Sequence, residues 1–390
     1  MESFKCKNNI VYCWCNGLDK ASLLQIENIC TLPFVFHHLA LMPDVHAGVG
    51  MPIGGVLPTK DVVIPIAVGT DIGCGMCAVK TNIKKESLRQ NTFRGIIEKI
   101  RKYIPVGFNH QNIGQDENLM PQGFDIDNLR IVQNEYKVAL KQIGTLGGGN
   151  HFIELQNDEE GWLWIMLHSG SRDLGKQVCS YYNKKAKFLN ERYYSVVPNH
   201  IGLSFLPSGT TEFKEYWDEM GYCIEFAKCN RSLMMKRVTE IISSLYPNVE
   251  FDDIIDIAHN YASKERHFGQ DVIVHRKGAI KVPKGKIGII PGSQGTCSYI
   301  VEGLGNPNSL CSASHGAGRT MSRMDAKRRL DLNHEIALMN KKGIIHNMNS
   351  IKDLDEATGA YKDIDVVMAN QMDLVKIVRK LFPLAVIKGK

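Results

Sequence analysis

The feature that most constrains the fold of this sequence is a repeated arrangement in which an apolar segment adjoins a glycine-rich loop with a polar side chain. Apolar runs of this length between turn signals are typical of buried strands. Four loops of this kind occur, and their polar residues are Asp71 and Cys74, His151, His168 and His259. Loops at strand ends commonly carry binding and catalytic groups. We therefore expect a sheet-based protein whose loops build a functional site.

The four loops carry the donor types of a transition-metal site. Thiolate, imidazole and carboxylate together suit zinc, iron or manganese, and they do not suit a magnesium or calcium cage. Taken singly, a histidine at a strand end is more often a hydrogen-bonded surface or core residue. The Asp71–Cys74 segment alone is more often a turn carboxylate beside a buried thiol. Because the pattern recurs in four loops, we interpret the set as a metal site.

A further stretch places one histidine among small residues. His315 is followed by Gly316 and Gly318, and Arg319 lies four positions on. Without bulky side chains the backbone can approach a ligand closely, and a histidine in that setting can act as a nucleophile toward phosphorus. Read alone, the stretch is equally a glycine-rich turn with a solvated histidine.

Other segments suggest phosphate binding. The loop 291–298 carries two glycines and three hydroxyl side chains, so its backbone N–H groups can face an anion. It lacks the Gly-Lys-Ser/Thr sequence of a P-loop, and an ordinary strand-to-strand turn also fits it. Arg172, Arg319 and Arg323 can clamp phosphates or remain solvated charges. The segment 44–46 fits either hydrogen bonding within its loop or support of a neighbouring site.

Composition narrows the class of protein. The chain has 390 residues, enough for one large domain or two ordinary ones. It contains no apolar run of membrane-spanning length and no secretory signal at its start, so we expect a cytoplasmic protein. Its eleven scattered cysteines do not indicate a disulfide framework. The net charge of +6 permits a nucleic-acid or phosphate partner without requiring one.

The expected elements mix strands and helices irregularly, which argues against a doubly wound sheet. Strands are expected at 61–69, 76–81, 162–167, 272–275, 279–282, 286–290 and 384–388, and those between 272 and 290 are expected to form a meander. Apolar spacing predicts helices over 90–104 and 132–143. A long helical pattern over 213–245 is expected to contain a break or bend. Residues 1–70 are expected to hold short strands and turns.

Together, these motifs resemble the RtcB family of RNA ligases. The matching stretches are 42–48 (MPDVHAG), 71–75 (DIGCG), 147–154 (GGGNHFIE), 168–172 (HSGSR), 259–261 (HNY), 275–279 (HRKGA), 291–293 (PGS) and 315–319 (HGAGR). They run in order over nearly the whole chain, which makes the resemblance specific. Gln294 stands where family members often carry methionine, and the chain is shorter than many members, so differences are expected in peripheral loops.

The resemblance implies a fold and an activity. The fold is α+β, with mixed, mostly antiparallel, stacked β-sheets surrounded by helices, in a single intertwined domain over residues 1–390. The activity is that of a GTP- and manganese-dependent ligase in tRNA splicing or RNA repair. It joins RNA ending in a 2′,3′-cyclic phosphate or 3′-phosphate to RNA with a 5′-hydroxyl, through His-GMP and an activated RNA(3′)pp(5′)G end. We expect a monomer without a membrane partner, and the need for an accessory activator protein is open.

The resemblance also assigns roles to residues, motif by motif. One Mn²⁺ would be held by Asp71, Cys74 and His151. The second Mn²⁺ would be held by Cys74, His168 and His259, with the thiolate shared. His315 would be the catalytic nucleophile. The residues implied in binding GTP are Asn150, His151, Phe152, Ile153, Glu154, His259, Asn260, Pro291, Gly292, Ser293, Gln294, Ser298, His315, Gly316, Ala317, Gly318 and Lys388.

Two other functions use the same residues. In a binuclear metal phosphohydrolase, His315 would only bind phosphate. In a non-enzymatic, metal-stabilised RNA-binding protein, the metals would hold the fold and no covalent adduct would form. A GMP adduct on His315 separates the ligase from both alternatives.

Overall fold

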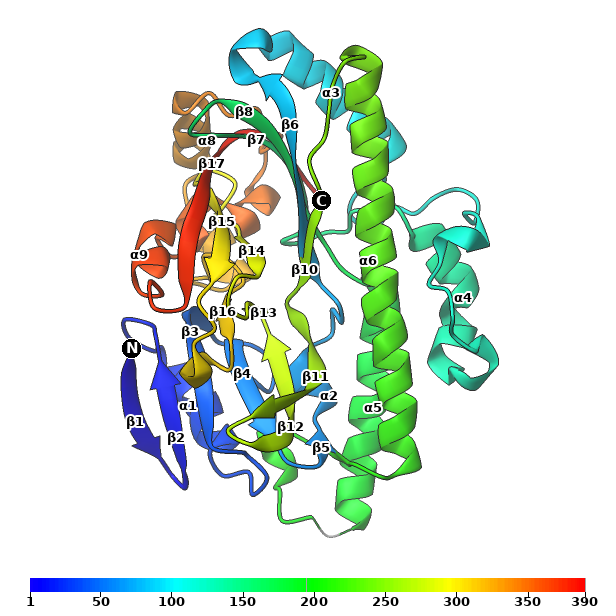
Figure 1. The fold of residues 1–390 in the computed structure, drawn as a ribbon, viewed down its shortest axis with the longest axis vertical. Coiled ribbons are helices and arrows are strands. Elements are labelled where there is room, and N and C mark those ends of the chain that lie inside the picture. Colours follow the sequence, from blue (N-terminus) through cyan, green and yellow to red (C-terminus); the bar gives the residue numbers. More distant parts are fainter. Residues whose placement is uncertain (194, 390) are drawn as a thin grey trace.

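Two stacked β-sheets form the centre of the fold, and long helices run along one side of them (Figure 1). The structure is a computed structural model that describes residues 1–193 and 195–389. One apolar cluster joins the two sheets, because it contains Met42 and Val56 from the first sheet and Trp164 and Val386 from the second. The sheets therefore share a core.

The first sheet has six strands in the order β1–β2–β3–β4–β12–β11. Their bounds are Glu2–Cys6 (β1), Asn9–Cys13 (β2), His38–His46 (β3), Ile53–Thr59 (β4), Gln270–Lys277 (β12) and Asn260–His267 (β11). The pair β2–β3 is parallel, and the other neighbours are antiparallel. This sheet fills the lower left of Figure 1.

The second sheet has seven strands in the order β10–β6–β8–β7–β17–β15–β14, all antiparallel to their neighbours. Their bounds are Ile255–Ala258 (β10), Gly75–Lys84 (β6), Trp162–Ser169 (β8), Phe152–Asp158 (β7), Val375–Lys388 (β17), Ser298–Gly303 (β15) and Ile287–Ile290 (β14). Side chains alternate between its faces. Phe152 of β7 joins the cluster between the sheets, whereas Ile153 and Leu155 join the cluster under the helices.

Shorter elements complete the fold. Two strand pairs are β13 (Ala279–Lys281) with β16 (Ser312–Ser314), and β5 (Val62–Val63) with β9 (Leu206–Pro207). The helices are α1 (Lys20–Ile29), α2 (Pro65–Val68), α3 (Gln90–Tyr103), α4 (Arg130–Gln142), α5 (Arg172–Arg192), α6 (Thr211–Leu245), α7 (Arg323–Arg329), α8 (Leu332–Lys341) and α9 (Ile364–Ala369). Single 3₁₀ turns are η1 (Lys85–Ser87), η2 (Glu117–Leu119), η3 (Ile126–Asn128), η4 (Asn199–Ile201), η5 (Pro307–Ser309), η6 (Ile351–Glu356) and η7 (Thr358–Ala360).

Helix α6 runs the length of the molecule (Figure 1). The hydroxyl oxygen of Thr210 accepts the backbone N–H of Phe213 and caps its start. Met234, Val238 and Ile242 on this helix are fully buried in the cluster beneath the second sheet. The packing of this apolar stripe holds 35 residues as one helix.

The structure confirms the α+β class, with mostly antiparallel stacked sheets, and the helices expected over 90–104 and 132–143. The expected break within 213–245 was wrong, because the helix contains no proline and its packing is continuous. The expected meander over 272–290 was also wrong, since β12, β13 and β14 belong to three different sheets. Within 61–69 only Val62–Val63 is a strand, because Pro65 begins α2.

Residues 1–70 also contain a helix that was not expected, α1. The carboxylate of Asp19 accepts the backbone N–H of Ser22 and caps it. No helix in the described part of the chain has both the length and the apolarity to cross a membrane.

Candidate active site

Neighbouring strands of the second sheet bring the predicted metal donors together. Cys74 immediately precedes β6, whose Met76 pairs with His168 of β8. Ala258 of β10 pairs with Gly75, so His259 begins beside Cys74. His168 also pairs with Phe152, which places His151 at the same end of the sheet. Sheet register therefore gathers four loops that are far apart in the sequence.

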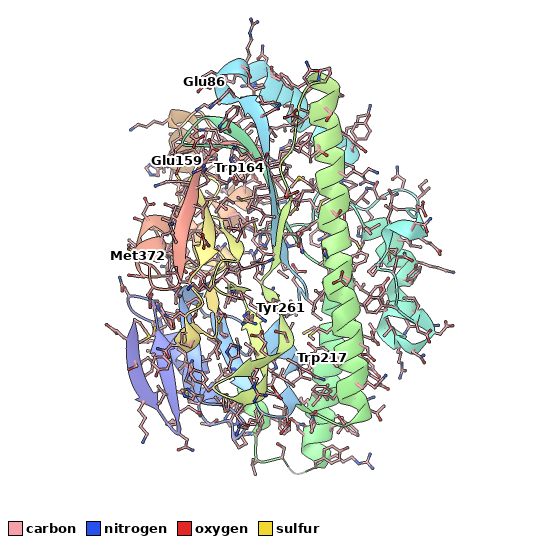
Figure 2. All side chains as sticks on the ribbon, in the orientation of Figure 1. Glu86, Glu159, Trp164, Trp217, Tyr261 and Met372 are labelled. Atoms are coloured by element: carbon pink, nitrogen blue, oxygen red, sulfur yellow. The ribbon has the colours of Figure 1, made fainter. Side chains whose placement is uncertain are left out.

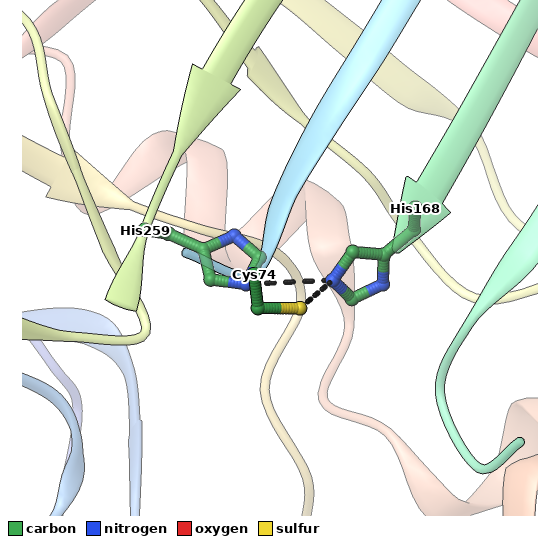
Figure 3. Close-up of side chains that lie close together, drawn as sticks. All are labelled: Cys74, His168 and His259. Carbon is green, nitrogen blue, oxygen red and sulfur yellow. Dashed lines mark hydrogen bonds between the residues drawn. The ribbon is translucent and has the colours of Figure 1, made fainter. Parts of the chain in front are cut away.

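Neighbouring donor atoms lie within hydrogen-bonding range, and Figure 3 shows those of Cys74, His168 and His259. The Sγ atom of Cys74 lies 3.2 Å from Nε2 of His168 and 3.4 Å from Nε2 of His151. Nε2 of His168 lies 3.4 Å from Nε2 of His259. Nε2 of His151 lies 2.9 Å from Oδ2 of Asp71. The donors form two groups of three that share Cys74, and the ligand atoms of each group lie within 4.8 Å of one another.

The chemistry of these atoms fits a cation. Nδ1 of His168 donates to the carbonyl of Asn150 at 3.2 Å, so its Nε2 presents a lone pair to the cluster. Two imidazole Nε2 atoms at such close range need a proton or a cation between them. Oδ1 of Asp71 is buried and has no hydrogen-bond partner among the described residues. Such an unsatisfied buried oxygen is a natural ligand.

Burial sets the protonation of the cluster. It raises the pKa of the Cys74 thiol well above the usual range, and the charge of Asp71 adds to this effect. Burial lowers the pKa of His168 and of His259 well below the usual range, with further lowering by neighbouring imidazoles. Without a cation, Cys74 is thus a neutral thiol beside the neutral imidazoles of His168 and His259.

Two buried side chains of α6 tie the metal loops to the scaffold. The amide of Asn230 accepts the backbone N–H of Gly144 at 2.7 Å and donates to the carbonyl of Gly170 at 3.2 Å. The guanidinium of Arg231 donates to the carbonyl of Gly73 at 2.8 Å and to both carboxylate oxygens of Asp256. Asn230 and Arg231 therefore connect three loops to one helix.

His315 lies next to the metal cluster, with its ring centroid 4.8 Å from that of His259. Its Nδ1 donates to Oδ2 of Asp44 at 2.6 Å, and its backbone N–H donates to the same oxygen at 3.1 Å. The Asp44 side chain is fully buried. This contact fixes the tautomer, so Nε2 of His315 keeps a free lone pair.

Glycine is required at Gly318 by the approach of Asp44. Its φ is +74°, and a Cβ there would lie 2.2 Å from the Asp44 carbonyl oxygen. At Gly278 a Cβ would meet the His315 ring at 3.0 Å and Ile53 at 2.3 Å. The small residues around His315 thus allow the contact between His315 and Asp44.

His315 lines a pocket of about 140 Å³, and the metal donor His168 lines it as well. The predicted residues that line it are Asn150, Phe152, Glu154, Pro291, Gly292, Ser293, Gln294, His315, Gly316, Ala317, Gly318 and Lys388. The structure does not bring Ile153 or Ser298 to this lining. The Ile153 side chain lies in the core under the helices, and Oγ of Ser298 accepts the backbone N–H of Gly292 from behind the loop. Asn260 instead donates to the carbonyl of Asp71 at 3.1 Å.

The loop 291–298 differs from the expected anion cradle. Its hydroxyl groups already accept its own backbone donors: Oγ1 of Thr296 accepts the N–H of Ser293 at 2.7 Å, and Oγ of Ser293 accepts that of Gly295. These hydroxyl groups therefore hold the loop in shape. This leaves fewer free N–H groups than the composition indicates.

Charged groups surround the deep end of the pocket. Glu154 is fully buried, and burial raises its pKa to about 7. Burial lowers the pKa of Lys388, whose Nζ lies 3.6 Å from Glu356. Arg319 and Arg323, predicted as phosphate clamps, both donate to Glu356, at 3.3 and 2.9 Å. The third predicted clamp, Arg172, donates instead to Thr145 and to the carbonyl of Gly107.

A larger cleft of about 1100 Å³ opens on the other side of the metal donors. Asp71 and His151 line it together with Lys176, Lys327 and Lys352. It shares its inner wall with the smaller pocket, and the shared residues are Asn150, Gln294, Arg323, Glu356 and Lys388. His315 and the metal donors therefore lie between two openings.

Sequence reasoning missed several residues of this region. Glu356 and Tyr361 belong to no recognised motif, yet Oη of Tyr361 donates to the Glu356 carboxylate at the pocket wall. Arg231 and Asn230 lie within a helix and belong to no recognised motif. A charged residue inside the buried stripe of α6 was the one hint available, because a buried arginine needs partners.

Comparison with known proteins gives one result. The family model described as tRNA-splicing ligase RtcB matches residues 25–389. The chain is 37% identical to the RNA-splicing ligase RtcB of Escherichia coli (strain K12), over 98% of each chain. It is 32% identical to the tRNA-splicing ligase RtcB of Nanoarchaeum equitans, over 95% of this chain and 92% of that one. It is 30% identical to the tRNA-splicing ligase RtcB of Methanococcus maripaludis, over 94% of this chain and 91% of that one.

These relatives are all named as ligases, and the donors gathered around Cys74 suit a metal-dependent one. The fold and the site are thus those of a metal-dependent ligase. Because the family model covers nearly the whole chain, the chain belongs to the RtcB family.

Proposed function

We propose that this protein is a GTP-dependent RNA ligase that joins 3′-phosphate or 2′,3′-cyclic phosphate ends to 5′-hydroxyl ends, in tRNA splicing or RNA repair. The observation that carries this proposal is the position of His315. Its Nε2 is left free by the Asp44 contact, beside a cluster of metal donors and at the wall of a pocket. Few non-catalytic roles need an imidazole held in one tautomer there.

In the first step Nε2 of His315 attacks the α-phosphorus of GTP, and pyrophosphate leaves. Asp44 orients the ring and stabilises the positive charge that develops on it. Two Mn²⁺ ions, held by Asp71, Cys74 and His151 and by Cys74, His168 and His259, would supply charge neutralisation for the phosphates. The product is His-GMP.

In the second step the RNA 3′-phosphate attacks the phosphorus of His-GMP and releases His315. The RNA then ends in (3′)pp(5′)G, whose GMP is a good leaving group. The 5′-hydroxyl of the other RNA attacks the 3′-phosphorus, and GMP departs. A cyclic phosphate must first be opened by water to give the 3′-phosphate.

We assign the smaller pocket to guanylate and the larger cleft to RNA. The pocket adjoins Nε2 of His315, and its lining includes most of the predicted nucleotide-binding residues. The cleft has lysines at its rim and an almost fully exposed aromatic ring, Phe108, at 95% exposure. Aromatic stacking together with basic groups is how proteins bind single-stranded nucleic acid. Residues 1–390 would act as one catalytic domain, as a cytoplasmic monomer.

The test is a joining assay with two labelled RNAs of defined ends. With GTP and Mn²⁺, we expect joining of a 3′-phosphate end to a 5′-hydroxyl end and none with a 3′-hydroxyl end. A phosphohydrolase would instead release phosphate without joining. An RNA-binding scaffold would retard the RNA on a gel and leave both ends unchanged.

A further inference from the structure

Two thiols outside the active site lie side by side at a surface pocket. The Sγ atoms of Cys13 and Cys15 are 3.4 Å apart. Both residues line a pocket of about 450 Å³, and so does Met372. Met372, labelled at the left edge of Figure 2, is 74% exposed. The pocket therefore opens to solvent, although the thiols at its base are only 5% and 6% exposed.

We propose that Cys13 and Cys15 are a redox modification site, which a hydroperoxide converts reversibly to an intramolecular disulfide. The proposal rests on the thiol pair and its pocket, and it is independent of the ligase function. The oxidant we name is a small hydroperoxide, because Cys13 and Cys15 are only 5% and 6% exposed.

The two thiols are not equivalent. The contact with Cys15 lowers the pKa of Cys13 to about 7, whereas the contact with Cys13 raises the pKa of Cys15. The thiolate is the nucleophilic form of cysteine. Cys13 is therefore the attacking thiol, and Cys15 is the one that resolves the product.

The reaction balances in two steps. The Cys13 sulfur attacks the terminal peroxide oxygen, the O–O bond breaks, and the alcohol leaves, so that Cys13 becomes a sulfenic acid. The Cys15 sulfur then attacks the Cys13 sulfur, the S–S bond forms, and the oxygen leaves as water. In sum, two thiols and ROOH give a disulfide, ROH and water, with two electrons passing from sulfur to the peroxide.

The chain spacing makes this disulfide a labile one. Only one residue separates the two cysteines, and Cys15 lies at a bend just after β2. A disulfide between them closes a very short loop, in which the preferred disulfide geometry is hard to reach. Strained disulfides have higher reduction potentials and are the reversible ones. A small dithiol should therefore restore the thiols readily.

The site borders the strand that carries Asp44. Cys13 of β2 pairs with Leu41 of β3, and the backbone N–H of Trp14 donates to the Leu41 carbonyl at 3.0 Å. Asp44 lies three residues further along β3. Another thiol contact, between Cys6 and Cys30, involves a fully buried Cys30 and offers a comparison within the same chain.

The test uses a convenient peptide. Cleavage after Lys7 and Lys20 releases residues 8–20, which contain Cys13 and Cys15 and no other cysteine. The folded protein is treated with hydrogen peroxide, denatured, alkylated with iodoacetamide, digested and analysed by mass spectrometry. We expect this peptide to lose both alkyl labels and two hydrogen atoms, and to regain both labels after dithiothreitol treatment.

Variants assign the roles. Cys13→Ser should abolish the oxidised peptide signal, and Cys15→Ser should leave a sulfenic acid on Cys13 that dimedone traps. Cys179→Ser, a buried cysteine elsewhere, should leave the disulfide yield unchanged. The proposal is overturned if peptide 8–20 keeps both labels at peroxide doses that oxidise other cysteines of the folded protein. Because this measurement is made on the wild-type protein, it tests the proposal even where a serine variant fails to fold.

Discussion

Oδ2 of Asp44 accepts two hydrogen bonds from one residue, His315: from Nδ1 at 2.6 Å and from the backbone N–H at 3.1 Å. The carboxylate is fully buried, and it reaches His315 from strand β3, 271 residues away in the sequence. One side chain therefore fixes the position, the tautomer and the charge environment of the proposed nucleophile.

Asp44→Asn keeps the shape of this contact and removes its charge. We expect the rate of His315 guanylylation to fall by roughly 10- to 100-fold, as for other partners that orient a catalytic or ligating imidazole. The rate is measured as incorporation of label from [α-³²P]GTP, with circular dichroism as the check on folding. Asp252→Asn, an exposed aspartate, is the matched control. An unchanged rate in Asp44→Asn would show that the contact is only structural.

Cys74 is common to both groups of metal donors. We expect Cys74→Ser to lose both Mn²⁺ ions, whereas His259→Ala should lose only one. Metal content after equilibrium dialysis gives the stoichiometry. Cys77→Ser is the control, because Cys77 is equally buried but belongs to the core beneath the helices. Retention of two ions by Cys74→Ser would contradict a shared thiolate.

Arg231 is 1% exposed, and it joins the carbonyl of Gly73 to Asp256. Arg231→Met removes the buried partner of an ion pair whose other member, Asp256, is 22% exposed. Breaking a fully buried pair costs about 3–5 kcal/mol, so a loss of up to about 3 kcal/mol applies here. We expect a loss of that size in the free energy of unfolding and weaker metal binding, measured by urea titration and metal content. Lys236→Met, on the same helix but in an exposed pair with Glu240, should change stability by less than about 1 kcal/mol. Equal effects of the two substitutions would refute this role of Arg231.

The raised pKa of Glu154 predicts that the stability of the protein depends on pH. Burial raises its pKa from 4.5 to about 7 in the folded chain. The folded state then binds more protons than the unfolded state between these values, so stability is fully present below pH 4.5 and falls as the pH rises to about 7. At about 1.4 kcal/mol per pKa unit, the loss between pH 4.5 and about 7 is at most about 3.5 kcal/mol.

The comparison is with Glu154→Gln, which keeps an acceptor for Gln156 but does not titrate. We expect the stability difference between wild type and this variant to change across that pH range, by urea denaturation of the metal-free protein. Glu98→Gln, at an exposed position, is the control, and its free energy of unfolding should change with pH as that of the wild type does. If the free energy of unfolding of Glu154→Gln changes with pH as that of the wild type does, the Glu154 carboxyl does not have a raised pKa.

The metal donors could be predicted from the sequence because each lies in a short motif beside an apolar segment, and all of these motifs except that of His259 contain glycine. Glu356 and Arg231 could not, because their roles arise from contacts between segments distant in the sequence. The strands β12, β13 and β14 were located correctly, but their partners were not. Strand pairing depends on long-range packing, which local turn signals do not encode.

Long-range packing also determines the length of helix α6. Its length exceeds what local pattern supports, and burial of Met234 and Val238 against the second sheet keeps it continuous. The roles assigned to the pocket residues stay predictions. Of these, the position of Ile153 in the core beneath the helices leaves only its backbone to face a nucleotide.

Incubation with [α-³²P]GTP and Mn²⁺, followed by denaturing electrophoresis, tests the central claim most directly. We predict an adduct that acid destroys and base preserves, on His315 by mass spectrometry. His315→Ala should form none, and His200→Ala, outside the pocket, should form the wild-type amount. Absence of the adduct from the wild-type protein, or an equal amount in His315→Ala, would contradict the account.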